Sequence, residues 1–97
     1  MRAEYDSEAD ALAIDLVLEP RAAWADEIDD RSNVAVTEGG EPVSIEILYP
    51  SMGMDEPLRI AAERHGLDVE ALRIAAHAAV AAPDRVIIIE VKARSLA

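Results

Sequence analysis

The chain has 97 residues, which suits one domain, and it carries a formal net charge of −11. Residues 1–50 hold three Arg against thirteen Asp or Glu, whereas residues 51–97 hold six basic and seven acidic side chains. The absence of Cys excludes disulfides and zinc–thiolate sites. Binding to phosphate backbones needs clustered Lys or Arg, which this acidic chain lacks in its first half, so we expect no nucleic-acid partner.

No apolar run approaches the roughly 20 residues of a membrane span. The first residues, Met1-Arg2-Ala3-Glu4, lack the apolar segment of a signal peptide. The expectation is a cytoplasmic protein that makes no membrane contact.

Alternating apolar and polar side chains predict a small antiparallel β-meander over residues 1–49. An acidic turn at residues 6–10 separates the first two strands, and Gly39-Gly40 tolerates the positive φ of a tight hairpin. One face of the last meander strand is apolar and the other is mixed, which is typical of a sheet covered on one side. The expected strands are residues 2–6, 11–18, 22–28, 34–38 and 43–49.

Residues 55–82 have the start and stop signals of a two-helix hairpin. Asp55 is expected to cap the first helix, and Gly66 suits its left-handed C-terminal position. Asp68 is expected to cap the second helix, which Pro83 ends. The apolar faces are Leu58, Ala61, Ala62 and His65 in the first helix and Leu72, Ala75, Ala76 and Ala79 in the second.

The last expected element is a strand over residues 85–93, and its run of Ile and Val predicts burial on both faces. Such a strand must pair within its own sheet or with a second subunit, because an exposed apolar edge invites aggregation. We expect a homodimer with this strand or a helix face at a two-fold interface. The candidate interface residues are Val86, Ile87, Ile88, Ile89 and Val91.

These elements predict a single α+β domain over residues 1–97. It consists of a small antiparallel β-meander, a two-helix hairpin packed on one face, and a C-terminal strand.

Several short stretches carry a family resemblance: Tyr5-Asp6, Glu8-Ala9-Asp10-Ala11-Leu12, Glu27-Ile28-Asp29, Val34-Ala35-Val36 and Ile45-Glu46-Ile47-Leu48. Together they resemble the domain-of-unknown-function family 2283, a group of small bacterial and archaeal proteins. Residues 50–97 extend beyond the usual short form of that family. The resemblance implies no known reaction, and it implies an antitoxin-like role beside a toxin-like partner as one alternative.

Asp6, Glu8 and Asp10 alternate at the first turn and are candidate ligands of a hard cation. They lack the Gly turn and the distal bidentate acid of a calcium loop, so turn capping and solvation are the favoured roles. Asp10 and Glu46 are a candidate acid–base pair, but no nucleophile or oxyanion-binding group accompanies them. The sequence therefore favours no catalytic residue, no metal and no cofactor.

His65 and His77 are twelve residues apart, which matches no zinc motif. Glu70, Arg73 and His77 share one helix face. The spacing of Ala62, Gly66 and Leu72 resembles a helix-turn-helix core. The second helix would open with acidic residues, however, so a hairpin packed on the sheet is favoured over DNA binding.

The favoured function is a non-enzymatic interaction module, homodimeric or bound to a basic protein, because the first half of the chain is acidic. The alternative is a small-ligand or enzymatic site between the sheet and the helices, lined by Trp24, Glu46 and Tyr49. A polar-lined cavity of ~300 Å³ or more would distinguish this alternative.

Overall fold

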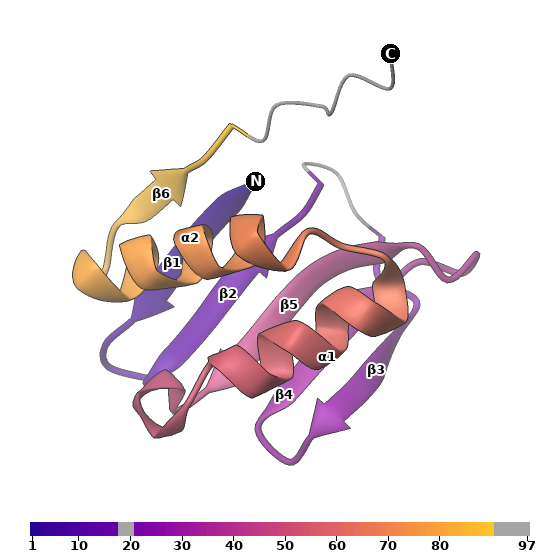
Figure 1. Cartoon of the computed structure of the whole chain (residues 1–97), viewed down its shortest axis with the longest axis horizontal. Coiled ribbons are helices and arrows are strands. Elements are labelled where there is room, and N and C mark those ends of the chain that lie inside the picture. Colours follow the sequence, from indigo (N-terminus) through magenta and orange to yellow (C-terminus); the bar gives the residue numbers. More distant parts are fainter. Residues whose placement is uncertain (18–20, 91–97) are drawn as a thin grey trace.

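The computed structural model describes residues 1–17 and 21–90 of the chain. Its elements form a six-stranded antiparallel sheet with two helices on one side (Figure 1), so the predicted α+β architecture is confirmed. Leu18 and Val91, which the sequence places in strands, lie outside the described residues. The elements are β1 (Arg2–Asp6), β2 (Ala11–Asp15), β3 (Trp24–Asp29), β4 (Ser32–Val36), β5 (Pro42–Leu48), the short 3-10 helix η1 (Pro50–Met52), α1 (Asp55–His65), α2 (Val69–Ala81) and β6 (Val86–Ile88).

The strands lie in the order β3-β4-β5-β2-β1-β6, and every neighbouring pair is antiparallel. The β1–β2 hairpin and the β3–β4–β5 meander are joined by pairing between β2 and β5. In that pairing Leu12 lies opposite Ile47, and Ile14 lies opposite Ile45. β3 and β6 are consequently the two edges of the sheet.

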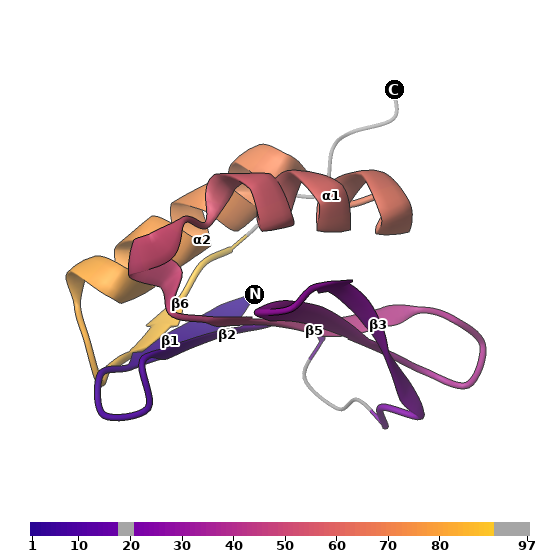
Figure 2. The ribbon, with the colours of Figure 1, turned by 90° about the horizontal axis from the view of Figure 1, so that it is seen from below.

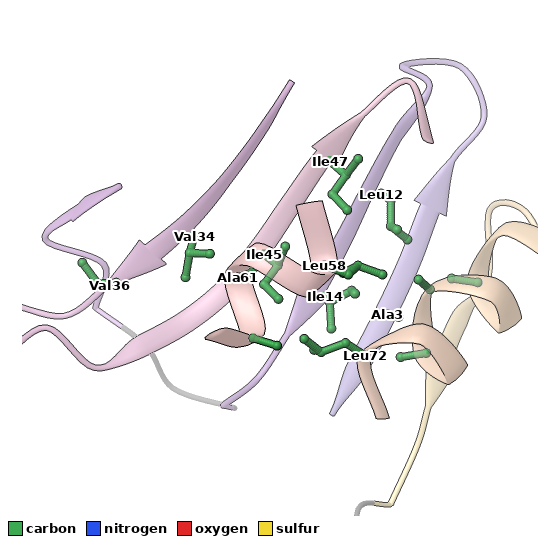
Figure 3. Close-up of a cluster of buried hydrophobic side chains, with 14 residues drawn as sticks. Ala3, Leu12, Ile14, Val34, Val36, Ile45, Ile47, Leu58, Ala61 and Leu72 are labelled. Carbon is green, nitrogen blue, oxygen red and sulfur yellow. The ribbon is translucent and has the colours of Figure 1, made fainter. Parts of the chain in front are cut away.

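The covered face of the sheet carries large aliphatic side chains, and the helices pack alanines against them. Figure 3 shows the buried side chains between the sheet and the helices. α2 lies over β1, β2 and β6, and α1 lies over β3, β4 and β5 (Figure 1). Small helix side chains allow the two layers to approach closely. The buried helix residues, apart from Pro57 in the first turn of α1, are those that the periodicity predicts: Leu58, Ala61, Ala62, Leu72, Ala75, Ala76 and Ala79.

The helix ends confirm three of the four predicted signals, since α2 ends at Ala81, shortly before Pro83. Gly66 has φ of 65° at the C-terminus of α1, and the Asp68 side chain accepts hydrogen bonds from two backbone N–H groups of α2. The predicted cap of α1 is wrong. Met54 occupies the N-cap position without a side-chain hydrogen bond, and Asp55 lies in the first turn. There its carboxylate faces the positive end of the helix dipole.

β6 departs from the prediction that the last strand is buried on both faces. Ile87 lies opposite Ala3, a residue of the covered face. Val86 and Ile88 point to the other face and are 51% and 76% exposed. The prediction is wrong because a continuous apolar run does not specify where in a sheet a strand lies. Here the strand is at an edge and has β1 as its one neighbour.

Candidate interaction edge

The outer edge of β6 carries backbone groups that do not pair with β1. Met1 and Ile89 exchange backbone hydrogen bonds of 2.9 and 3.2 Å. Because an antiparallel ladder alternates between inward and outward groups, Val86 and Ile88 direct their N–H and C=O groups away from β1. Within residues 1–17 and 21–90, no strand pairs with this edge. The edge therefore combines free backbone groups with two exposed aliphatic side chains.

The opposite edge, β3, is protected by charge. Its six residues include the three carboxylates of Asp26, Glu27 and Asp29, and its pairing with β4 is irregular between Glu27 and Asp29. Charged side chains and bulges are devices that prevent sheets from joining edge to edge. Residues 86–89 of β6 and its continuation have neither charge nor proline. This difference makes β6 the edge that is open to another strand.

Asp26 also attaches the β3 edge to the end of α1. His65 Nε2 lies 2.9 Å from Asp26 Oδ2, and Arg64 Nη1 lies 3.3 Å from Asp26 Oδ1. The hydrogen bond with His65, followed by the charge of Arg64, lowers the pKa of Asp26 below its ordinary value. With 11% of its side chain exposed, His65 acts as an anchor between helix and sheet.

Two acids of the first turn, Asp6 and Asp10, serve as hydrogen-bond acceptors. Asp6 Oδ1 accepts from the N–H groups of Glu8 and Ala9 at 3.0 and 3.1 Å, which confirms its predicted capping role. The Tyr5 hydroxyl donates to Asp10 Oδ1 at 2.7 Å, and this hydrogen bond raises the pKa of Tyr5. In the described part of the chain, no group of three metal-binding side chains is arranged to hold an ion.

Asp84 fastens the same turn to the segment that follows α2. It accepts hydrogen bonds from the backbone N–H and the hydroxyl of Ser7, at 2.9 and 2.6 Å. These hydrogen bonds lower the pKa of Asp84. The two hydrogen bonds hold the first turn against the segment that follows α2.

The three residues of the predicted ligand site are not brought together. Trp24 lies on the covered side of the edge strand β3, whereas Glu46 lies opposite Ala13 on the uncovered face. Tyr49 follows β5 in a left-handed conformation with φ of 51°. The space between the sheet and the helices is filled by the aliphatic core. The register also places Glu46 opposite Ala13 and not beside Asp10, its predicted acid–base partner.

A groove of about 480 Å³ lies instead on the surface of the helices. Arg73 Nε and His77 Nε2 lie 3.6 and 3.8 Å from the same oxygen of Asp55. Glu70 lies 3.8 Å from another Arg73 nitrogen, so two carboxylates offset the charge of Arg73. Sequence periodicity placed Glu70, Arg73 and His77 together, but it gave no signal that Asp55 of the other helix faces them. The groove is lined by Asp55, Glu70, Arg73, Ile74 and His77.

These features define a two-layer α+β protein with one protected and one open sheet edge. The chain belongs to the family described as protein of unknown function (DUF2283), whose model matches residues 2–51. The match covers β1 to β5 and the start of η1, so the helices and β6 lie beyond it. Comparison with curated proteins and with solved structures gave no match. Neither helix of the described residues has the length and apolar character needed to cross a membrane.

Proposed function

We propose that the protein is a non-enzymatic interaction module that self-associates into a homodimer through β6. The observation that carries the proposal is the difference between the two edges of the sheet. β3 has three carboxylates and an irregular register, whereas β6 exposes Val86 and Ile88 beside free backbone groups. An antiparallel strand pair is self-complementary under a two-fold axis, so two β6 edges can join two sheets into one.

Pairing of the two edges would satisfy the outward backbone groups and bring the exposed aliphatic side chains of the two copies beside each other on the uncovered face. Burying an aliphatic side chain of this size contributes about 1.5–3 kcal/mol when it is fully exposed beforehand. Val86 and Ile88 are 51% and 76% exposed, and contact with the neighbouring strand would cover only part of that surface, so their contribution to association is a fraction of this range. We also propose that the protein is bacterial and cytoplasmic and that it has no nucleic-acid or membrane partner. The acidic surface supports this, because it would repel negatively charged phosphate groups.

The test is the solution mass of the wild type and of two matched variants, measured by light scattering at micromolar concentration. Ile88→Lys places a charge at the proposed interface, and Ile74→Lys makes the same change at an exposed position of α2. We expect dimer mass for the wild type and Ile74→Lys, and monomer mass for Ile88→Lys. Unchanged circular dichroism shows that the variants are folded. A monomeric wild type, or a dimeric Ile88→Lys variant, would refute the interface.

A further inference from the structure

The uncovered face of the sheet has a composition opposite to that of the covered face. Figure 2 shows both helices on the same side of the sheet. Residues that alternate with the core positions point to the other side. On β2 to β5 this open face carries mainly small side chains where the covered face carries Leu, Ile and Val, and its larger aliphatic side chains are Leu48 and those of the β6 edge. The small residues are Ala11, Ala13, Ala25, Ala35 and Ser44.

A row of carboxylates crosses the open face. Paired positions run across the six strands as Val86, Glu4, Ala13, Glu46, Asn33 and Glu27. The three glutamates are exposed and occupy every second strand, which places them about 10 Å apart.

The neighbouring row does not neutralise these glutamates. It contains Arg2 and Asp15, which form an ion pair of 2.9 Å with each other. Arg2 is therefore already paired. Arg31 lies on the other side of the glutamate row and donates to the backbone oxygens of Leu48, Tyr49 and Gly53. Among the described residues, no salt bridge joins a cation to the three glutamates of the first row. The open face presents negative charge around an alanine-lined centre.

This pattern restricts what can cover the face. Close packing between layers is achieved when large side chains of one layer meet small side chains of the other. Inside the protein the sheet supplies the large side chains, but on the open face it supplies the small ones. An occupant must bring large aliphatic side chains and positive charge. A second copy fits poorly because it would bring the same glutamates, and a dimer through β6 extends the face sideways without covering it.

We propose that the open face binds an amphipathic helix of a basic partner protein. Large aliphatic side chains of that helix pack on the strip around Ala13 and Ala35, and its Lys or Arg residues pair with Glu4, Glu27 and Glu46. This inference rests on the proposed role as an interaction module. It uses a surface separate from the β6 edge, so each protomer carries its own complete site.

The probe is a synthetic helical peptide of about 18 residues with a leucine stripe flanked by lysines. Its affinity is measured by fluorescence anisotropy, and its position is mapped by NMR amide shifts. Glu46→Lys changes the open face, whereas Glu63→Lys makes the same charge change on α1, in the helical layer. We expect Glu46→Lys to weaken binding at least ~10-fold and Glu63→Lys less than ~2-fold. The shifts should cluster on the open-face residues of β1 to β5.

Equal losses in the two variants would overturn the proposal, because they would report attraction by net charge alone. The absence of wild-type binding, or equal binding of a peptide with glutamates in place of the lysines, would also overturn it. Ile88→Lys is titrated in parallel. Retained peptide binding by a monomeric Ile88→Lys variant supports a site within each protomer, and loss of binding in that variant refutes it. If the β6 dimer does not form, light scattering shows this separately as a monomer mass for the wild type.

Discussion

The close approach of the helices to the sheet predicts that Ala76 cannot accept a larger side chain. Ala76 is fully buried within the core cluster, where α2 covers the aliphatic face of the sheet. Ala76→Leu adds three carbon atoms to a side chain that has no exposed surface. Inserting methylenes into a packed core typically destabilises a protein by about 1–3 kcal/mol. For a domain of this size, the unfolding midpoint should fall by roughly 4–8 °C for each kcal/mol.

The matched control is Ala81→Leu, which makes the same chemical change at an exposed position at the end of the same helix. An exposed substitution of this kind should change the free energy of unfolding by no more than about 0.5 kcal/mol. Both variants are measured by urea unfolding in the Ile88→Lys background at one protein concentration, so that dimerisation does not contribute. Equal free energies of unfolding for Ala76→Leu and Ala81→Leu would refute the close spacing of helices and sheet at Ala76.

Two further predictions concern local contacts. Asp26→Asn removes a carboxylate whose pKa in the folded protein is lowered by His65. A carboxylate whose pKa is lowered by folding stabilises the fold at pH values above its unfolded-state pKa, and this stabilisation is lost as pH falls through its folded-state pKa. The free energy of unfolding of the wild type should therefore exceed that of the variant by about 1 kcal/mol near pH 6 and by less near pH 3. Urea unfolding at the two pH values checks this, and a difference that grows on acidification would contradict it. Asp68→Ala should cost about 1 kcal/mol through loss of the helix cap, seen as a lower thermal midpoint by circular dichroism, whereas Asp68→Ser should retain most of the stability. An unchanged midpoint for Asp68→Ala would contradict that role.

The parts of the fold that depend on local chemistry were predictable from the sequence. Gly66 and Asp68 fix the turn between the helices through backbone conformation and capping, which are properties of a few neighbouring residues. The buried stripe that contains Leu72 follows from helical periodicity alone. Asp55 was misassigned because helix boundaries inferred from capping residues commonly differ by one or two positions.

Long-range pairing was not predictable in the same way. The sequence pattern does not say that β2 pairs with β5 across the intervening β3 and β4. The contact between Asp26 and His65 joins residues 39 positions apart, and no local signal links them. For the same reason the apolar run at Val86 and Ile88 predicted a strand but not its place at the edge. The candidate interaction edge therefore became visible only with the strand order.

The two proposed surfaces would act together. A dimer formed through β6 would place two open faces side by side on one extended sheet. A partner with two basic amphipathic helices would then bind both faces, and linkage of the two sites would raise its overall affinity without any new contact. Disrupting β6 would reduce binding of such a two-helix partner more than binding of a single helix.

Hydrogen exchange of the β6 amides tests the central proposal most directly. The amide of Ile87 points toward β1, whereas the amide of Ile88 points outward. If β6 pairs with β6 of a second copy, exchange at Ile88 slows as protein concentration rises, and exchange at Ile87 is slow throughout. The Ile74→Lys variant should behave in the same way. Fast exchange at Ile88 that does not depend on concentration would contradict the β6 dimer.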